Sequence, residues 1–155
     1  MSKTAFYDSL LLQLQALIEG EDDLIANLAN ASALLNLALE DLNWVGFYLL
    51  KSPNELVLGP FQGKPACLRI PVGKGVCGTA VASGQTQRVA DVHAFAGHIA
   101  CDGASNSEIV LPIFAQGRVV AVLDIDSPSL DRFDAEDQIG LERVATALEK
   151  LCWNG

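Results

Sequence analysis

Apolar positions recur every three or four residues in three stretches of the chain, which is the spacing that places them along one side of a helix. These stretches predict helices over residues 4–18, about 22–42 and about 134–153. In the first helix the apolar stripe consists of Phe6, Leu10, Leu11, Leu14, Leu17 and Ile18. Asp134, with Asp137 three residues later, has the side chain and the position of an N-cap for the last helix.

The middle of the chain is instead rich in aromatic and β-branched residues, in short runs separated by turn residues, which is the pattern of strands. The predicted strands cover residues 44–50, 55–61, 67–71, 87–90, 108–114 and 119–125. The glycine-rich residues 73–83 predict a turn that leads into a short helix. Residues 91–107 have no clear period and predict a long loop.

The order of these elements predicts an α+β fold, with a central antiparallel sheet and helices packed on one face of it. With 155 residues and no internal repeat or linker, the chain has the length of one domain. We expect residues 1–155 to form that domain from N-terminal helices (4–42), the sheet with its active-site loops (43–127) and a C-terminal helix (134–153).

Composition and charge narrow the class of partner. Hydrophobic residues make up 50% of the chain, which excludes a disordered protein, and 10 Lys and Arg against 19 Asp and Glu give a formal net charge of −9. Contacts to nucleic-acid phosphates and to anionic membrane surfaces depend on Lys and Arg, so we expect neither partner. Since neither a membrane span nor a signal peptide is recognisable, we expect a cytoplasmic protein that binds small molecules or proteins.

Four cysteines need an explanation, because the cytosol keeps thiols reduced. Cys101 lies in the predicted loop, three residues after His98, where a thiolate would be accessible as a nucleophile. The alternative is that Cys101 packs under the loop as a small apolar side chain. Either Cys67 or Cys77 could resolve an oxidised Cys101 as a disulfide, and spacing along the chain does not choose between them.

A zinc site is another use for these thiols. Its candidate ligands would be Cys67, Cys77, His93, His98 and Cys101. None of them forms the short Cys-x₂₋₄-Cys pair typical of structural zinc, so we predict no metal. Both histidines fit ordinary hydrogen-bonded loop residues, and we expect Cys152, near the end of the last helix, to take no part in the chemistry.

Carboxylates interrupt an apolar strand at its end. Asp124 and Asp126 flank Ile125, so the two-residue period of a strand points both to the same face, and Glu108 opens the neighbouring predicted strand. Adjacent like charges raise the pKa of at least one carboxyl group, and a neutral carboxyl can donate a proton. The cluster suits a cationic ligand group, a general acid, or both. The alternative is that these acids are simply solvated at the wet end of a sheet.

Two aromatic residues and three glycines allow further alternatives. Trp44 and Tyr48 are four residues apart on a predicted strand and so share a face, where they either pack in the core or wall a ligand pocket that accepts a methyl-sulfur group. Gly73, Gly75 and Gly78 suit a turn, or a nest of backbone N–H groups that binds an anion.

Seven motifs of the chain match the pattern of one known family. They lie at residues 43–48, 59–63, 75–80, 91–93, 98–102, 105–112 and 123–127. The fifth is His98-Ile99-Ala100-Cys101-Asp102, and the last is Leu123-Asp124-Ile125-Asp126-Ser127. With these motifs, the chain from about Trp44 to the last helix resembles the free methionine-(R)-sulfoxide reductase family, whose members are stand-alone GAF domains.

This resemblance implies a GAF-like fold and a cofactor-free oxidoreductase that reduces free L-methionine (R)-S-oxide to L-methionine. It implies that Cys101 is the catalytic thiol, Cys67 the principal resolving thiol and Cys77 an accessory one. The Cys101 thiolate would attack the sulfoxide sulfur and become a sulfenic acid. Cys67 would convert that acid to an intramolecular disulfide, which thioredoxin or a similar dithiol would reduce.

The resemblance also implies roles for the acids and aromatics. Glu108, Asp124 and Asp126 would bind the substrate, Glu108 or one of the two aspartates would donate a proton, and Trp44 would contact the methyl end of the substrate, with Tyr48 on the same face. A homodimer is implied as well, to which the N-terminal helices could contribute surface. Two other functions stay open: a GAF module that senses a nucleotide or similar ligand without chemistry, and a cysteine redox sensor.

Overall fold

A six-stranded antiparallel sheet forms the centre of the computed structural model, which describes residues 1–97 and 103–153. The strands are β1 (Trp44–Ser52), β2 (Glu55–Gly63), β3 (Arg69–Pro71), β4 (Gln87–Val89), β5 (Ser107–Ala115) and β6 (Arg118–Ser127). They lie in the order β3-β2-β1-β6-β5-β4, and every neighbouring pair is antiparallel. The predicted α+β fold with a central antiparallel sheet is confirmed.

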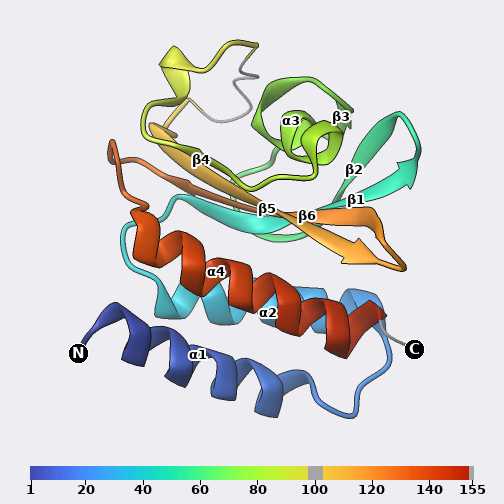
Figure 1. Ribbon diagram of the computed structural model, residues 1–155, viewed down its shortest axis with the longest axis vertical. Helices are drawn as coiled ribbons and strands as arrows, with labels where there is room; N and C mark the ends of the chain where they lie inside the picture. Colours follow the sequence, from blue (N-terminus) through green and yellow to red (C-terminus); the bar gives the residue numbers. More distant parts are fainter. Residues whose placement is uncertain (98–102, 154–155) are drawn as a thin grey trace.

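The helices occupy both sides of this sheet (Figure 1). Their bounds are α1 (Lys3–Ile18), α2 (Leu24–Ala38), α3 (Gly75–Ser83) and α4 (Ala135–Leu148), with a 3₁₀ turn η1 (Val92–Ala94) and a π-helical turn η2 (Glu149–Trp153) that continues α4. Helices α2 and α4 cover one face, and α1 packs outside them as a further layer. The prediction that helices pack on one face of the sheet holds for these three long helices. The short α3 lies on the opposite face.

Successive side chains of the central strands point to opposite faces of the sheet and so contribute to two separate cores. One core lies between the sheet and the long helices and takes from the strands Val45, Phe47, Leu49, Ile109, Leu111, Ile113, Ala121, Leu123 and Ile125. The other, which we call the α3-side core, joins Trp44, Tyr48, Val110 and Val122 of the sheet to Val76, Cys77 and Ala80 of α3. Both faces of the central strands are therefore buried.

Helix α2 and strand β3 are both shorter than predicted. Helix α2 begins at Leu24 because the Asp23 side chain accepts a hydrogen bond from the Ala26 N–H as its N-cap, and it ends at Ala38 because Leu39 turns to an extended backbone. Strand β3 begins at Arg69, and Cys67 lies ahead of it, because the Cys67 carbonyl accepts from a side-chain hydroxyl, that of Tyr48, at 2.8 Å.

A partly buried polar cluster joins the start of α1 to the start of α4. The predicted N-cap is confirmed, because the Asp134 carboxylate accepts a hydrogen bond from the Asp137 N–H at 2.9 Å. The Asp137 carboxylate in turn accepts one from the Asp134 N–H. The Tyr7 hydroxyl donates to Asp137 at 2.8 Å, and the Lys3 ammonium pairs with both aspartates. The Tyr7 ring lies where a Cβ on Gly140 would be, so only glycine permits this approach.

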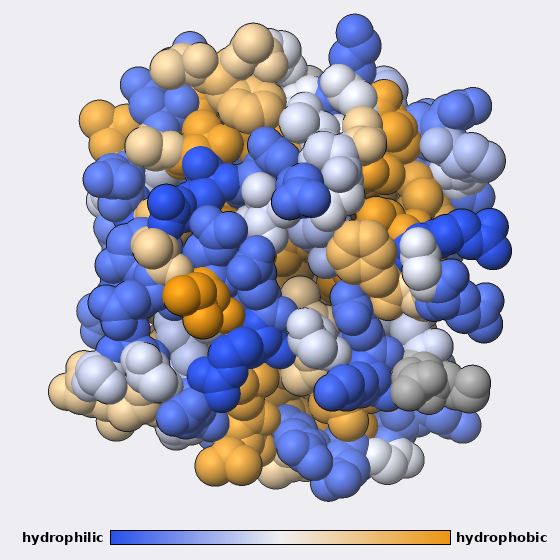
Figure 2. Space-filling model, viewed as in Figure 1, coloured by the Kyte–Doolittle hydropathy of each residue, from blue (hydrophilic) through white to orange (hydrophobic). Residues whose placement is uncertain are grey.

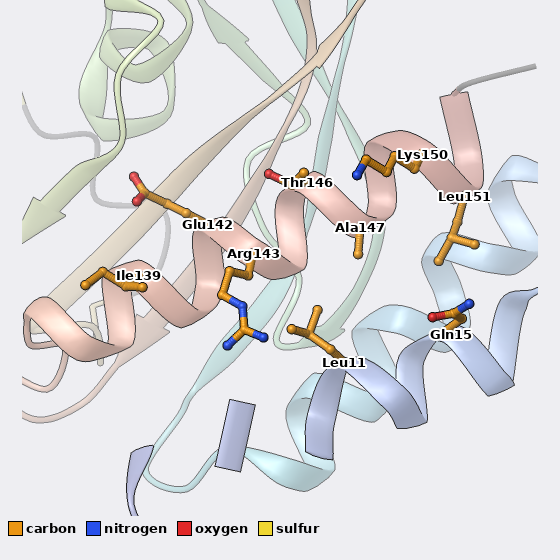
Figure 3. A pocket seen from close by; sticks show the side chains of 9 residues that line it. All are labelled: Leu11, Gln15, Ile139, Glu142, Arg143, Thr146, Ala147, Lys150 and Leu151. Carbon is orange, nitrogen blue, oxygen red and sulfur yellow. The ribbon is translucent and has the colours of Figure 1, made fainter. Parts of the chain in front are cut away.

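The side of the molecule that faces the viewer in Figure 1 has a largely polar surface. Hydrophilic residues cover most of the face seen in Figure 2, and the apolar residues between them lie in several separate places. A groove runs between α1 and α4, away from the α3-side core (Figure 3). Its lining residues are Leu11, Gln15, Ile139, Glu142, Arg143, Thr146, Ala147, Lys150 and Leu151. Among the described residues, no helix has both the length and the apolar character needed to cross a membrane.

Candidate active site

Three carboxyl groups meet on the α3 side of the sheet, at one end of β5 and β6. Glu108 pairs with Asp126 across these strands, and Asp126 in turn lies opposite Trp44 of β1. Asp124 is two residues away on the same face, opposite Gly46. All three carboxylates are buried, with 5 to 9% of each residue exposed. The solvated alternative considered from the sequence is therefore wrong: these acids lie inside the protein.

Burial and mutual repulsion hold this cluster partly protonated. Burial raises the pKa of Glu108 well above its usual 4.5, and the neighbouring charges of Asp124 and Asp126 raise it further. Interactions with the side chains of both aspartates also raise this pKa, and a neutral Glu108 can donate its single proton to one of them. Among the described residues, Oδ1 of Asp124 is buried without a hydrogen-bond partner. The cluster thus offers a neutral proton donor beside an acceptor atom that a ligand can use.

Cys77 lies at the same place but is poorly suited to act as a nucleophile. It is on α3, is 5% exposed, and its sulfur is within 4.8 Å of carboxylate oxygens of Glu108 and Asp124. Burial raises the pKa of this thiol well above 9.0, and Asp124, Glu108 and Asp126 raise it further. A thiol is nucleophilic only as the thiolate, so Cys77 is held in its unreactive form.

The same atoms are the ones that could hold a metal ion. Sulfur from Cys77 and one oxygen each from Glu108 and Asp124 give three ligand atoms close enough to share a cation. This set differs from the zinc ligands considered from the sequence and shares only Cys77 with them. His93 lies elsewhere, where its ring Nε2 is 3.1 Å from the Asn106 side-chain oxygen.

The aromatic residues of β1 form one wall of the site. The rings of Trp44 and Tyr48 stack with their centroids 5.9 Å apart, and Phe61 of β2 also stacks on Trp44, at 5.2 Å. Phe61 can approach because Gly46 has no side chain: a Cβ there would overlap the backbone and Cβ of Phe61. Sequence reasoning missed Phe61 as part of this wall, although it lies in the second of the seven motifs.

The polar groups of Trp44 and Tyr48 donate hydrogen bonds to the segment that carries Cys67. The Trp44 indole N–H donates to the Lys64 carbonyl at 3.1 Å, and the Tyr48 hydroxyl donates to the Cys67 carbonyl at 2.8 Å. Cys67 is half-buried and packs against the α3-side core. Cys101 and His98 lie outside the described residues, so Cys101 is not placed relative to Cys67 or to the carboxylates.

The three glycines at the start of α3 do not form an open anion nest. The Gly73 N–H donates to the Gly78 carbonyl at 2.9 Å, the Gly75 N–H to Gly97 at 3.1 Å, and the Gly78 N–H to Lys74 at 3.0 Å. Each of these backbone donors is used within the protein, so the alternative of a turn is the correct one for Gly73, Gly75 and Gly78.

Cys152 lies far along the chain from this cluster. It is a free, half-buried cysteine in η2, it packs against the core under the long helices, and burial raises its pKa to about 11. No residue of the carboxylate cluster belongs to that core, which agrees with the expectation that Cys152 takes no part in the chemistry.

Comparison with known proteins agrees with this architecture. Residues 30–150 match the model of the GAF domain family. The chain is 58% identical to the free methionine-R-sulfoxide reductase of Escherichia coli (strain K12), over 97% of this chain and 91% of that protein. It is 49% identical to the free methionine-R-sulfoxide reductase of Neisseria meningitidis in complex with its substrate, with a TM-score of 0.92 over 97% of this chain and 90% of that one. It is 58% identical to fRMsr of Staphylococcus aureus in complex with substrate, with a TM-score of 0.89 over 94% of both chains.

The sheet order, the helices on its two faces and the match over residues 30–150 place the chain in the GAF domain family. The identities to the two named reductases extend over nearly the whole chain, not over a shared core alone. Within the GAF family, the chain is a member of the free methionine-R-sulfoxide reductases, which are oxidoreductases.

Proposed function

We propose that the chain reduces free L-methionine (R)-S-oxide to L-methionine, in a single GAF domain that spans residues 1–155. The observation that carries the proposal is the buried cluster of Glu108, Asp124 and Asp126 beside Trp44 and Tyr48. The Escherichia coli and Neisseria meningitidis relatives support it, because they are named for this reductase activity and the second has been solved with its substrate.

The carboxylates account for the choice of a free amino acid. Asp124, with its buried and partnerless Oδ1, and Asp126 bind the α-ammonium of the substrate, because a buried anionic oxygen gains most from a positively charged donor. A peptide nitrogen is uncharged and is bonded to the preceding residue. A peptide-bound methionine sulfoxide therefore cannot form this ion pair. The flat face of Trp44 takes the methyl-sulfur end, and Tyr48 completes that wall.

Glu108 supplies the proton that the sulfoxide oxygen needs. That oxygen leaves sulfur only when it is protonated, and burial beside Asp124 and Asp126 raises the pKa of Glu108, which favours the protonated carboxyl that can donate to it. Asp126 pairs with Glu108 across β5 and β6 and can return the proton to it between turnovers.

The thiols carry the electrons. The Cys101 thiolate attacks the substrate sulfur, the oxygen passes to Cys101 as a sulfenic acid, and methionine leaves. Cys67 then attacks the Cys101 sulfur to form a disulfide and water. Two facts support Cys67 as the resolving thiol: it is disulfide-bonded in the structure, whereas Cys77 and Cys152 are free. Cys77 keeps at most an accessory role because its thiol stays protonated.

Thioredoxin or a similar dithiol reduces the disulfide and completes the cycle in the cytoplasm, where such reductants are available. We also propose a homodimer. Exposed apolar side chains of the helical layer, such as Leu12, Leu37 and Ile139, offer surface for a second copy. Light scattering at micromolar concentration tests this, and a mass of one chain at all concentrations would contradict it.

Turnover of free methionine (R)-sulfoxide, with thioredoxin and its reductase as the electron source, tests the main proposal. Cys101→Ser should abolish turnover, and Cys152→Ser, which changes the cysteine that lies in the other core, should retain it. The S epimer and N-acetylmethionine sulfoxide, which lacks the ammonium, should both be poor substrates. Undiminished turnover by Cys101→Ser would refute the mechanism. Nucleotide binding by calorimetry, without sulfoxide turnover, would favour a sensor module instead.

A further inference from the structure

The segment of residues 64–68, which links β2 to β3, depends on the aromatic wall for its position. It belongs to neither strand, and three of its carbonyls accept hydrogen bonds. The Leu68 carbonyl takes the Leu58 N–H at 2.9 Å, and the other two take side-chain donors of β1, namely the Trp44 indole at 3.1 Å and the Tyr48 hydroxyl at 2.8 Å. Two of the three bonds therefore come from the wall of the proposed substrate pocket.

The Tyr48 bond acts on Cys67 itself. It fixes the carbonyl of the residue that carries the thiol, and with it the direction in which the Cα–Cβ bond of Cys67 points. Tyr48 is itself held in place: it is 2% exposed, and its ring stacks on Trp44, which in turn stacks with Phe61. Burial and the nearby charge of Asp124 raise the pKa of the Tyr48 hydroxyl, so it remains a donor at every physiological pH.

Disulfide formation is sensitive to this direction. The two Cα atoms must come within about 7 Å and the Cβ–S–S–Cβ dihedral must be near 90°, so a freely turning Cys67 presents its sulfur correctly only part of the time. A fixed carbonyl removes one of the backbone rotations that would misdirect the sulfur, which raises the effective concentration of the resolving thiol.

We infer that the Tyr48 hydroxyl is a positioning group for the resolving step: by binding the Cys67 carbonyl, it sets the rate at which Cys67 closes the disulfide. This inference rests on the proposed function and assigns the hydroxyl a task separate from the ring, which lines the pocket. In the step concerned, the Cys67 thiol attacks the Cys101 sulfenic acid, the S–O bond breaks, the S–S bond forms, and the hydroxide leaves with the thiol proton as water. The Cys101 sulfur is reduced and the Cys67 sulfur is oxidised, so no further reagent is needed.

Single-turnover kinetics of Tyr48→Phe separate the two steps, because this change removes the hydroxyl and keeps the ring. Reduced enzyme is mixed with one equivalent of free methionine (R)-sulfoxide, and quenched samples are assayed for methionine and for remaining thiols. We expect the rate of disulfide formation, relative to that of methionine formation, to fall about fivefold, since one hydrogen bond is worth about that factor. A dimedone adduct on Cys101 should accumulate in the variant.

Tyr7→Phe is the matched control. It also removes a buried tyrosine hydroxyl that makes a hydrogen bond, but the bond is to Asp137 at 2.8 Å, under the long helices. It should leave the ratio of the two rates unchanged. A second arm combines Tyr48→Phe with Cys67→Ser and resolves Cys101 with excess dithiothreitol. Adding Tyr48→Phe should then have no effect, because the thiol that it positions is absent.

The outcomes are distinct. Disulfide formation at the wild-type rate in Tyr48→Phe would overturn the inference, and so would an equal slowing of methionine formation. An undiminished effect in the Cys67→Ser background would also overturn it. If Tyr48→Phe does not fold, Trp44→Phe, which removes the donor to Lys64 on the same segment, should lower the same ratio of disulfide formation to methionine formation, and an unchanged ratio would overturn the inference. If the wild type forms no methionine, the proposed function fails. If the wild type forms methionine and Tyr48→Phe closes the disulfide at the wild-type rate, only the inference fails.

Discussion

Replacing Glu108 by glutamine should make the protein more stable at neutral pH, although it removes an ionisable group from a polar cluster. Burial, with Asp124 and Asp126 nearby, raises the pKa of Glu108 in the folded state well above 4.5. Above the unfolded-state pKa, unfolding therefore releases a proton, and the folded state is favoured less at each higher pH. Glutamine has the shape of the protonated acid and can donate its amide hydrogens to the same aspartates, but it has no proton to lose.

The magnitude follows from proton linkage. Between pH 4.5 and the folded-state pKa, the native protein binds one proton that the unfolded chain has released, so the free energy of unfolding falls by about 1.4 kcal/mol for each pH unit. Below pH 4.5 both states are protonated and the stabilising effect is fully present. The wild type should lose this stability as the pH rises through that window, and Glu108→Gln should not.

Urea unfolding of reduced protein at pH 5, 6 and 7, followed by circular dichroism, measures the effect as the difference between variant and wild type. Titrating groups outside the carboxylate cluster cancel in this difference. Glu136→Gln, on the surface of α4 and also one charge less, controls for the net charge of −9. A difference between Glu108→Gln and the wild type that stays flat from pH 5 to pH 7 would refute the argument, because it would mean that Glu108 ionises as readily in the folded protein as in the unfolded chain.

Three further expectations concern packing and thiol chemistry. Tyr7→Phe should destabilise the protein by about 1.5–3 kcal/mol, because the buried Asp137 loses a donor, and a urea midpoint equal to the wild type would contradict this. Gly46→Ala should cost about 1–3 kcal/mol through overlap with Phe61, and it should change the fluorescence of Trp44, which stacks on Phe61; unchanged stability and emission would show that β2 yields at no cost. Cys77 should resist iodoacetamide at pH 7 in the native protein and react after unfolding, and peptide mass spectrometry that finds rapid native labelling would argue against its buried, protonated state.

The periodicity of the sequence predicts most of the fold and brings the acids together for a sound reason. A strand in which Asp124, Ile125 and Asp126 alternate has only one arrangement that buries the isoleucine with other apolar side chains. The two aspartates must then share the other face, as they do. Glu108 follows for a similar reason, because two adjacent antiparallel strands joined by a short turn must place the start of one beside the end of the other.

What the sequence could not supply are the contacts that join distant segments. No local pattern says that the Tyr48 hydroxyl reaches the Cys67 carbonyl, 19 residues away, and so no pattern places Cys67 ahead of β3 instead of inside a strand. The side of the sheet that α3 covers is likewise set by tertiary packing, because its small apolar residues would suit either face. The Gly75 N–H looked available for an anion because its acceptor is a carbonyl 22 residues further along the chain, that of Gly97.

The two cores on opposite faces of β6 make this strand far less tolerant of a change in length than of a change in side chain. Deleting one residue from its first half shifts every later position by one, so Asp124 and Asp126 would enter the core under the long helices while Leu123 and Ile125 would face the carboxylate of Glu108. A bulge could absorb the change only by breaking the pairing with β1 and β5 on both edges at once. In a library of variants, single-codon deletions between residues 119 and 124 should therefore be depleted even where substitutions at the same codons survive.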